Sequence, residues 1–280
     1  MQALRYVVAD VFTDRPLTGN QLAVFTDARS LDDTTMQALA RETAFSETVF
    51  VLPPEGDGHV RIRIFTPVHE LPFAGHPVLG AAFVLGAPLQ LGVINLETGR
   101  GTIPVELERD ESGRIVFGRM AQPVPAVELV DDPTAILAAL GVERSLLPVE
   151  RYDLGPTHVF VCLPSTADVA ALTPDWGALA RLGGTGVIAF AGSGASWKAR
   201  MFSPDIGIED PATGSAAGPL ACHLARHGSI AWGDQIEIVQ GEEIGRPSKL
   251  YARALGGGGL IDAVEVGGSA VVVARGEFRV

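Results

Sequence analysis

The sequence is poor in cysteine and has no long apolar run. Cys162 and Cys222 are the two cysteines among 280 residues, and two isolated thiols give neither a disulfide framework nor the spacing of metal ligands. We expect both to be buried as small hydrophobic residues. No apolar run approaches the length that crosses a membrane, and the opening MQALRYVVADVF has neither the basic flank nor the cleavage site of a signal peptide. These absences predict a cytoplasmic protein without a membrane partner.

Positive charge is also scarce. Lys and Arg number 21 against 33 Asp and Glu, for a formal net charge of -12, and no Lys/Arg cluster interleaved with aromatic residues counters it. Such a chain repels a phosphate backbone, so we exclude nucleic acid as a partner. The hydrophobic fraction of 47% and the charged fraction of 19% are typical of a globular protein, and the length is sufficient for two domains, each with its own core.

Several catalytic fingerprints are missing. The sequence contains no GxSxG elbow, no Walker loop and no strand-linked GxGxxG, which argues against a serine hydrolase, an NTPase and a dinucleotide-binding enzyme. No two histidines form an HxH or HExxH pair, so we predict no bound metal and no other cofactor. The run GGGG at 256–259 is typical of a turn between strands, because no GK[ST] follows it.

Strand patterns dominate what is present. In residues 59–66, Val60, Ile62 and Ile64 alternate with Arg61 and Arg63, which predicts a half-exposed strand of an antiparallel sheet. Residues 32–43 begin with acidic residues and carry apolar residues at helical spacing, which predicts an amphipathic helix. Further strands are predicted around 4–12, 21–26, 47–53, 91–97, 101–108, 148–153, 157–163, 186–191, 197–203, 234–240, 249–256 and 269–277, and further helices near 77–86, 133–140, 174–182 and 215–227.

One segment is echoed almost half the chain later. Phe65-Thr66-Pro67 leads through a loop to Ala74-Gly75-His76 and a helix of small residues, and Phe202-Ser203-Pro204 leads in the same way to Thr213-Gly214-Ser215. In each copy Gly opens a helix whose free N–H groups would suit a carboxylate or enolate oxygen. The echo suggests a duplicated fold with a ligand between the halves and a linker near 118–133, although each junction by itself also fits an ordinary turn into a helix.

Two side chains of the first half are candidates for chemistry. Glu47 follows strand alternation onto the apolar face of Val49 and Val51, so its carboxylate lies either at an exposed strand end or in a dry pocket, where desolvation would raise its pKa toward neutrality. His76 follows Gly75 at the start of a helix. It either hydrogen-bonds a substrate oxygen or acts as a capping or packing residue.

The densest polar signal is EDPATGSAAGPLACHL at 209–224. Asp210 precedes a proline and is therefore held extended, and the hydroxyl and N–H of Ser215 lie at a helix start, where they could bind an anion or simply cap the helix. Downstream, Arg246 in VQGEEIGRPS could pair with a substrate carboxylate or with a structural Glu, and the roles of Arg246 and Gln240 stay open.

Five segments together resemble the signature segments of the PhzF-like (phenazine biosynthesis) family. They are DVFTDRPLTGNQLAVF, SETVFV, FTPVHELPFAGHPVLGAA, EDPATGSAAGPLACHL and QGEEIGRPS, in family order and spacing over nearly the whole chain. The resemblance implies an α+β fold of the diaminopimelate-epimerase type, in which each of two pseudo-symmetric halves wraps a mostly antiparallel sheet around a central helix. The halves would be 1–120, completed by the last strand at about 269–280, and 121–268, with the active site in the cleft between them.

The resemblance also implies a function. It predicts a cofactor-independent isomerase that shifts a proton on a small anionic substrate similar to dihydro-hydroxyanthranilate. Glu47 would be the acid/base, His76 and Asp210 would act with it as catalytic residues, and Ser215 would bind the substrate. Gly75 and Gly214 would offer backbone N–H groups, and the family often forms homodimers.

The sequence departs from two-base epimerases of this fold, which carry a thiol just before each helix-opening Gly. Those positions are Ala74 and Thr213 here, and neither is a base. A single carboxylate working on one face is therefore favoured. Two alternatives stay open: an epimerase with unconventional bases, and a non-catalytic binding or regulatory protein of the same fold.

Overall fold

The computed structural model describes residues 3–204 and 207–280, which divide into two compact units. The first unit holds the N-terminal part up to Gln122 together with Gly267–Val280, and the second holds Pro123–Val266. No helix of the described residues is long and apolar enough to cross a membrane.

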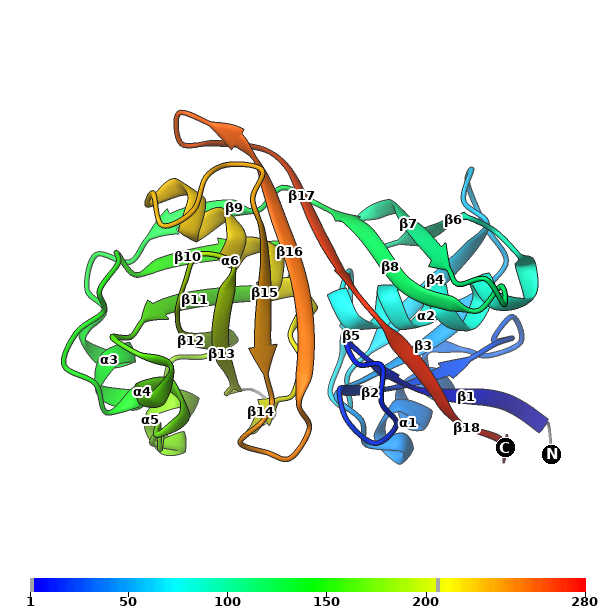
Figure 1. Cartoon of the computed structure of the whole chain (residues 1–280). Helices are drawn as coiled ribbons and strands as arrows, with labels where there is room; N and C mark the ends of the chain where they lie inside the picture. Colours follow the sequence, from blue (N-terminus) through cyan, green and yellow to red (C-terminus); the bar gives the residue numbers. More distant parts are fainter. Residues whose placement is uncertain (1–2, 205–206) are drawn as a thin grey trace. The chain divides into compact units, whose positions relative to one another are not determined.

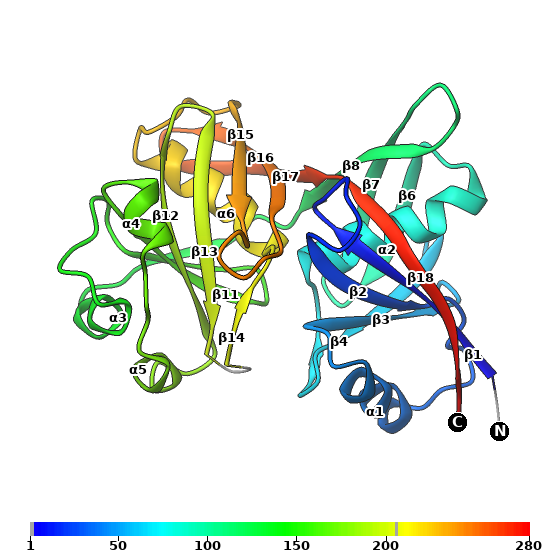
Figure 2. The same ribbon diagram turned by 60° about the horizontal axis from the view of Figure 1, so that its bottom comes forward.

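The first unit is a sheet wrapped around one helix (Figures 1 and 2). Its strands pair in the order β18-β1-β2-β3-β4-β6-β7-β8, with the short β5 beside β4. The central helix α2 (Gly75–Leu89) contacts strands from β18 across to β8, and nearly all of its N-terminal two thirds is buried. The strands are β1 (Ala3–Val11), β2 (Asn20–Phe25), β3 (Glu47–Leu52), β4 (Val60–Phe65), β5 (Glu70–Leu71), β6 (Val93–Thr98), β7 (Gly101–Arg109), β8 (Ile115–Gln122) and β18 (Ala270–Arg279).

The helix α1 (Asp33–Thr43) contacts β3 and β4. Asp32 caps it by accepting a hydrogen bond from the N–H of Thr35. Met36, Leu39 and Ala40 pack into a core with aromatic residues of the sheet, as the predicted amphipathic pattern requires. The predicted helix 32–43 and strand 59–66 are therefore confirmed to within a residue or two.

The second unit repeats the same pairing pattern. Its order is β9-β10-β11-β12-β13-β15-β16, with β14 beside β13, and the helix at the centre is α6 (Gly214–Arg226). The strands are β9 (Ala126–Leu129), β10 (Glu150–Asp153), β11 (Thr157–Cys162), β12 (Thr185–Ser193), β13 (Ser196–Ser203), β14 (Ile208–Asp210), β15 (Gln235–Gln240), β16 (Ser248–Gly257) and β17 (Leu260–Gly268), and the outer helices are α3 (Thr134–Leu140), α4 (Thr166–Ala170) and α5 (Trp176–Ala180).

The two patterns match strand for strand. β1–β2 and β10–β11 are antiparallel, β2–β3 and β11–β12 are parallel, and β4–β6 and β13–β15 are parallel again. The matched registers set Glu47 opposite Leu22, and Gly186 opposite His158. One residue further on, they pair Thr48 with Phe65 and Val187 with Phe202. Gly186 is therefore the counterpart of Glu47 in the second unit.

Five strands (β5, β8, β9, β14 and β17) and one helix (α4) were not predicted from the sequence. β8 and β9 occupy much of the segment taken as a linker near 118–133, and only 123–125 separate them. β17 follows the predicted glycine turn, and α4 has a single helical turn, too short for periodicity to reveal. Cys162 and Cys222 are free and buried, as predicted.

Candidate active site

In the first unit, the structure brings Glu47 and His76 together. Glu47 is the first residue of β3, and its side chain is 17% exposed, with Oε2 fully buried. His76 is the second residue of α2 and is 4% exposed, and its Nε2 lies 3.5 Å from Glu47 Oε2. The Glu47 side chain is thus partly buried, with one carboxylate oxygen shielded from solvent.

Asn20 fixes the orientation of the His76 ring. The Asn20 side-chain amide lies 3.3 Å from His76 Nδ1 through Nδ2, and its Oδ1 accepts a hydrogen bond from Ser46 Oγ. Because Nδ1 is engaged by Asn20, Nε2 is the nitrogen that faces Glu47. Burial lowers the pKa of His76 to about 3, so the ring is neutral near pH 7 and polarises a neighbour without carrying charge.

In the second unit, the polar residues gather at the start of α6. Thr213 Oγ1 donates to Asp210 Oδ2 at 2.5 Å, and Gln240 Nε2 donates to Asp210 O at 2.7 Å and to Thr213 Oγ1 at 2.9 Å. The Thr213 N–H lies 3.3 Å from Gln240 Oε1. Gln240, whose role the sequence left open, thus ties the end of β15 to the helix start.

Neither central helix is capped by its own N-cap side chain. Ala74 precedes α2 and has no polar group, and Thr213 precedes α6 but directs its hydroxyl to Asp210. Gly75, Gly214 and Ser215 are buried in the first turns that follow. In neither helix, therefore, does the N-cap side chain occupy the first-turn N–H groups, and the N-terminus of a helix suits an oxyanion.

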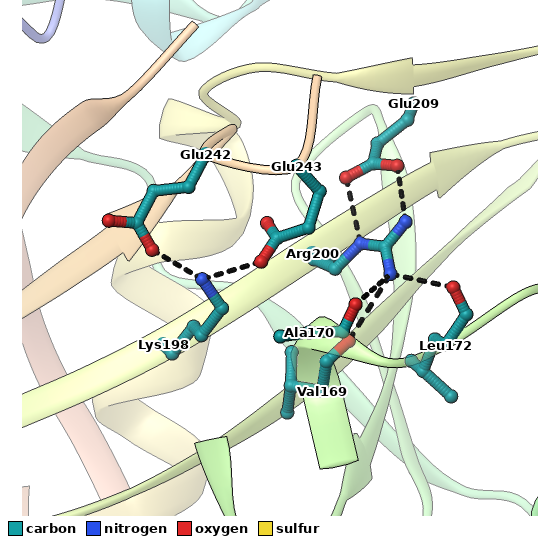
Figure 3. A network of polar contacts seen from close by, with 8 residues as sticks. All are labelled: Val169, Ala170, Leu172, Lys198, Arg200, Glu209, Glu242 and Glu243. Atoms are coloured by element: carbon teal, nitrogen blue, oxygen red, sulfur yellow. Dashed lines mark hydrogen bonds and ion pairs between the residues drawn. The ribbon is translucent and has the colours of Figure 1, made fainter. Parts of the chain in front are cut away.

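Charged side chains of β13 fix the segments that carry Asp210 and Gln240 (Figure 3). Arg200 makes two hydrogen bonds to Glu209, at 2.9 and 2.7 Å, and both side chains are 8% exposed. The same guanidinium donates to the carbonyls of Val169, Ala170 and Leu172. Because Glu209 precedes Asp210, this buried ion pair fixes the backbone at the candidate site.

The neighbouring Lys198 holds the loop that follows Gln240. Its ammonium lies 2.5 Å from Glu242 and 2.7 Å from Glu243. The first unit has a counterpart of the arginine pair, since Arg63 makes two hydrogen bonds to Glu70. The sequence contained one signal for these residues: the arginines stand two positions before the Phe of each echoed triplet.

A second buried cluster lies at the other end of α6. Glu150 Oε2 accepts a hydrogen bond from Tyr152 at 2.7 Å and lies 3.1 Å from His223 Nδ1 and 3.2 Å from His227 Nε2, while Arg226 lies 3.3 Å from Oε1. Burial would raise the pKa of Glu150, but the hydrogen bonds from His223, Tyr152 and His227 hold it well below its usual value.

Three members of this cluster could hold a metal ion. The ligand atoms of Glu150, His223 and His227 lie within 4.8 Å of one another, a grouping that the sequence did not reveal because it joins β10 to α6. Arg226 already balances the carboxylate, however, and a divalent cation would add uncompensated charge in a buried place. We therefore interpret the cluster as an anchor between α6 and β10.

The chain is similar to known proteins over nearly its whole length. A family model described as "Phenazine biosynthesis-like protein" (PhzC-PhzF) matches residues 9–276. Two curated relatives, from Pseudomonas aeruginosa and Pseudomonas chlororaphis, are both named trans-2,3-dihydro-3-hydroxyanthranilate isomerase. The first is 54% identical over 273 residues and the second 52% over 272, and each alignment covers 97% of this chain and 98% of the relative.

A solved structure shows the same fold. The crystal structure of a PhzF-family phenazine biosynthesis protein from Bacillus anthracis aligns with a TM-score of 0.87 over 100% of both chains, at 24% identity. This similarity confirms the α+β fold class predicted from the sequence.

Proposed function

Because the chain belongs to the PhzC-PhzF family of phenazine biosynthesis-like proteins and is an isomerase, we propose that it shifts a proton between two ring carbons of trans-2,3-dihydro-3-hydroxyanthranilate. The support for this substrate is the identity of 54% and 52% to relatives named for it. Those relatives are enzymes, which sets aside the non-catalytic alternative.

Glu47 is the proposed acid/base. In the reaction its carboxylate removes a proton from one carbon of the substrate and returns it to another, so that no electron leaves the substrate and no cofactor is consumed. The observation that carries this role is the buried Oε2 beside the neutral ring of His76. A carboxylate beside a neutral hydrogen-bonding group can take up and release a proton without separating two charges in a dry site.

The residues at the start of α6 are proposed to hold the substrate. Ser215 and the N–H groups of Gly214 and Gly75 bind its carboxylate and developing negative charge. Asp210, which Thr213 and Gln240 hold in place, binds its amino group. His76 contacts its oxygen.

Ala74 and Thr213 are the N-cap residues of the two central helices, where two-base epimerases of this fold carry thiols. In the second unit the position equivalent to Glu47 is Gly186. Only one of the two matched strands therefore carries a carboxylate at this position, which supports a one-base proton shift over epimerisation.

The test is Glu47→Gln, which keeps the shape of the side chain and removes its titratable proton. We expect kcat to fall by about 10²- to 10⁴-fold, with unchanged circular dichroism. In heavy water the native enzyme should place deuterium on carbon in the product or in recovered substrate. Glu106→Gln, an exposed change on β7, is the matched control and should retain activity. Near-native turnover by Glu47→Gln would refute the assignment.

We also propose that the protein is a cytoplasmic homodimer. The family resemblance supports the dimer, and the two free buried cysteines fit a reducing compartment. Sedimentation of the purified protein at micromolar concentration should give the mass of two chains.

A further inference from the structure

A histidine that the proposed reaction does not use lies behind Ser215. His158 on β11 is 3% exposed, and its Nε2 lies 2.9 Å from Ser215 Oγ. Its other ring nitrogen, Nδ1, is buried and has no hydrogen-bond partner within residues 3–204 and 207–280. The ring therefore has a single polar contact in this part of the chain, and that contact is Ser215.

The space for this ring exists because residue 186 is a glycine. Gly186 faces His158 in the parallel β11–β12 register, and a Cβ at this position would lie 2.6 Å from His158 Nδ1 and 2.7 Å from the terminal methyl group of Met201. Gly186 is also the counterpart of Glu47. The absence of a side chain where the first unit has its carboxylate thus lets the second unit place an imidazole against Ser215.

The surroundings of the ring decide where its proton lies. Nδ1 points to the place where a Cβ of residue 186 would lie, and it has no acceptor within the part of the chain that the structure describes. A buried N–H group without an acceptor is rarer in proteins than an acceptor without a donor. This favours the tautomer with the hydrogen on Nε2, in which Nε2–H donates to Ser215 Oγ. Burial lowers the pKa of His158 to about 4, which keeps the ring in this neutral form near pH 7.

We propose that His158 is a positioning residue. Its Nε2–H donates a hydrogen bond to Ser215 Oγ, so that the hydroxyl hydrogen of Ser215 points to the substrate carboxylate. A hydroxyl whose oxygen already receives a hydrogen bond keeps its own hydrogen for another partner, and an anion is the partner it binds most strongly. The inference rests on the proposed binding role of Ser215 and adds the residue that orients it.

Four variants test the coupling: Ser215→Ala, His158→Phe, the double variant, and His158→Gln, whose amide can replace the lost donor. With trans-2,3-dihydro-3-hydroxyanthranilate as substrate, Ser215→Ala should lower kcat/KM roughly tenfold or more, as expected for a lost hydrogen bond to a charged group. His158→Phe should lower it by a similar factor, mainly through KM. The double variant should be no worse than Ser215→Ala, and His158→Gln should recover part of the loss.

Binding of two probes separates positioning from a general packing defect. 3-Hydroxyanthranilate carries the carboxylate and 2-aminophenol lacks it, so His158→Phe should weaken binding of the first and leave the second unchanged. If His158→Phe only disturbed packing, it would weaken the binding of both probes. Its effect on kcat/KM would then multiply with that of Ser215→Ala in the double variant, and this result would overturn the inference.

Nitrogen NMR of the native protein measures the tautomer of His158 directly, so this test does not require any variant to fold. His158 should show a protonated Nε2 and an unprotonated Nδ1 at pH 7; the opposite tautomer would overturn the inference.

Failure of the inference is distinguishable from failure of the proposed function. A fully active Ser215→Ala would remove the proposed role of Ser215 and this inference with it. An impaired Ser215→Ala beside a native-like His158→Phe would overturn the inference alone. The Glu47 experiment reports on the proton shift independently of both.

Discussion

Buried neutral histidines should make this protein sensitive to acid in a defined pH range. Burial lowers the pKa of His76 to about 3 and of His158 to about 4, against an ordinary value of 6.5. The unfolded chain therefore binds protons below pH 6.5 that the folded chain does not. The stability is fully present above that pH and is lost progressively as the pH falls toward the folded values.

The size of the loss follows from these pKa values. At pH 5 an unfolded histidine is almost fully protonated while both buried rings remain neutral, so each ring lowers the free energy of unfolding by about 2 kcal/mol relative to pH 7.5. Burial also lowers the pKa of His223 and adds in the same direction. The pKa of Glu150 is lowered from its ordinary value of 4.5. The stability that this carboxylate contributes is therefore lost mainly below pH 4.5, outside the range from pH 7.5 to 5.

Urea unfolding followed by fluorescence and circular dichroism between pH 7.5 and 5 measures this effect. His158→Gln and His76→Gln should each lower the slope of the unfolding free energy against pH by about 1.3 kcal/mol per pH unit near pH 5.5. His76 belongs to the first unit and His158 to the second. His69→Gln is the control, because this ring is exposed and folding removes little water from it. A flat profile for the native protein, or an unchanged slope in both buried variants, would refute the argument.

Three further substitutions test the packing around the site. Arg200→Met leaves the buried Glu209 carboxylate without its cation. We expect the free energy of unfolding, measured with urea, to fall by about 3–5 kcal/mol and kcat/KM to fall as well. A decrease below about 1 kcal/mol would contradict the assigned role. Glu150→Gln should cost about 3 kcal/mol, because Arg226 loses its counter-charge in the cluster, and equal unfolding midpoints would show that the cluster is not an anchor. Gly80→Ala adds a Cβ that would lie 2.5 Å from a side chain of the facing strands. It should lower stability by about 1–3 kcal/mol in thermal unfolding despite the better helix propensity of Ala, whereas a raised melting temperature would show that the sheet yields to the extra methyl group.

The sequence predicted most elements whose pattern lies within one stretch of chain. The strand at 59–66 and the helix at 32–43 each carry their periodicity in a dozen residues or fewer, and both are present. β5, β8, β9, β14 and β17 were missed. β5 and β14 have only two and three residues, and the pattern of β9 is weak because most of its four residues are exposed. The proline-rich segment around 123–125 suggested a linker, although strands begin and end directly beside it.

The candidate site could be predicted only in part for the same reason. Gly75, Gly214 and Ser215 stand at helix starts that the Gly and Pro pattern reveals locally, and family motifs pointed to Glu47 and Asp210. Their neighbours could not be found in this way. Asn20 on β2 reaches His76 on α2, and Gln240 on β15 reaches Asp210 on β14, with no motif joining either pair.

By itself, the sequence determined the fold class, through the segments that resemble the PhzF-like family. It also determined the duplicated helix starts and the candidate proton-carrying residues, because these depend on backbone preferences and on short motifs. The tertiary structure alone decided their environments. It buried Glu47 against His76, placed His158 behind Ser215 in the space left by Gly186, and tied Glu209 to Arg200. Burial and hydrogen bonding set the protonation state of a side chain, and both depend on residues that only the folded sheet brings within a few ångströms of it.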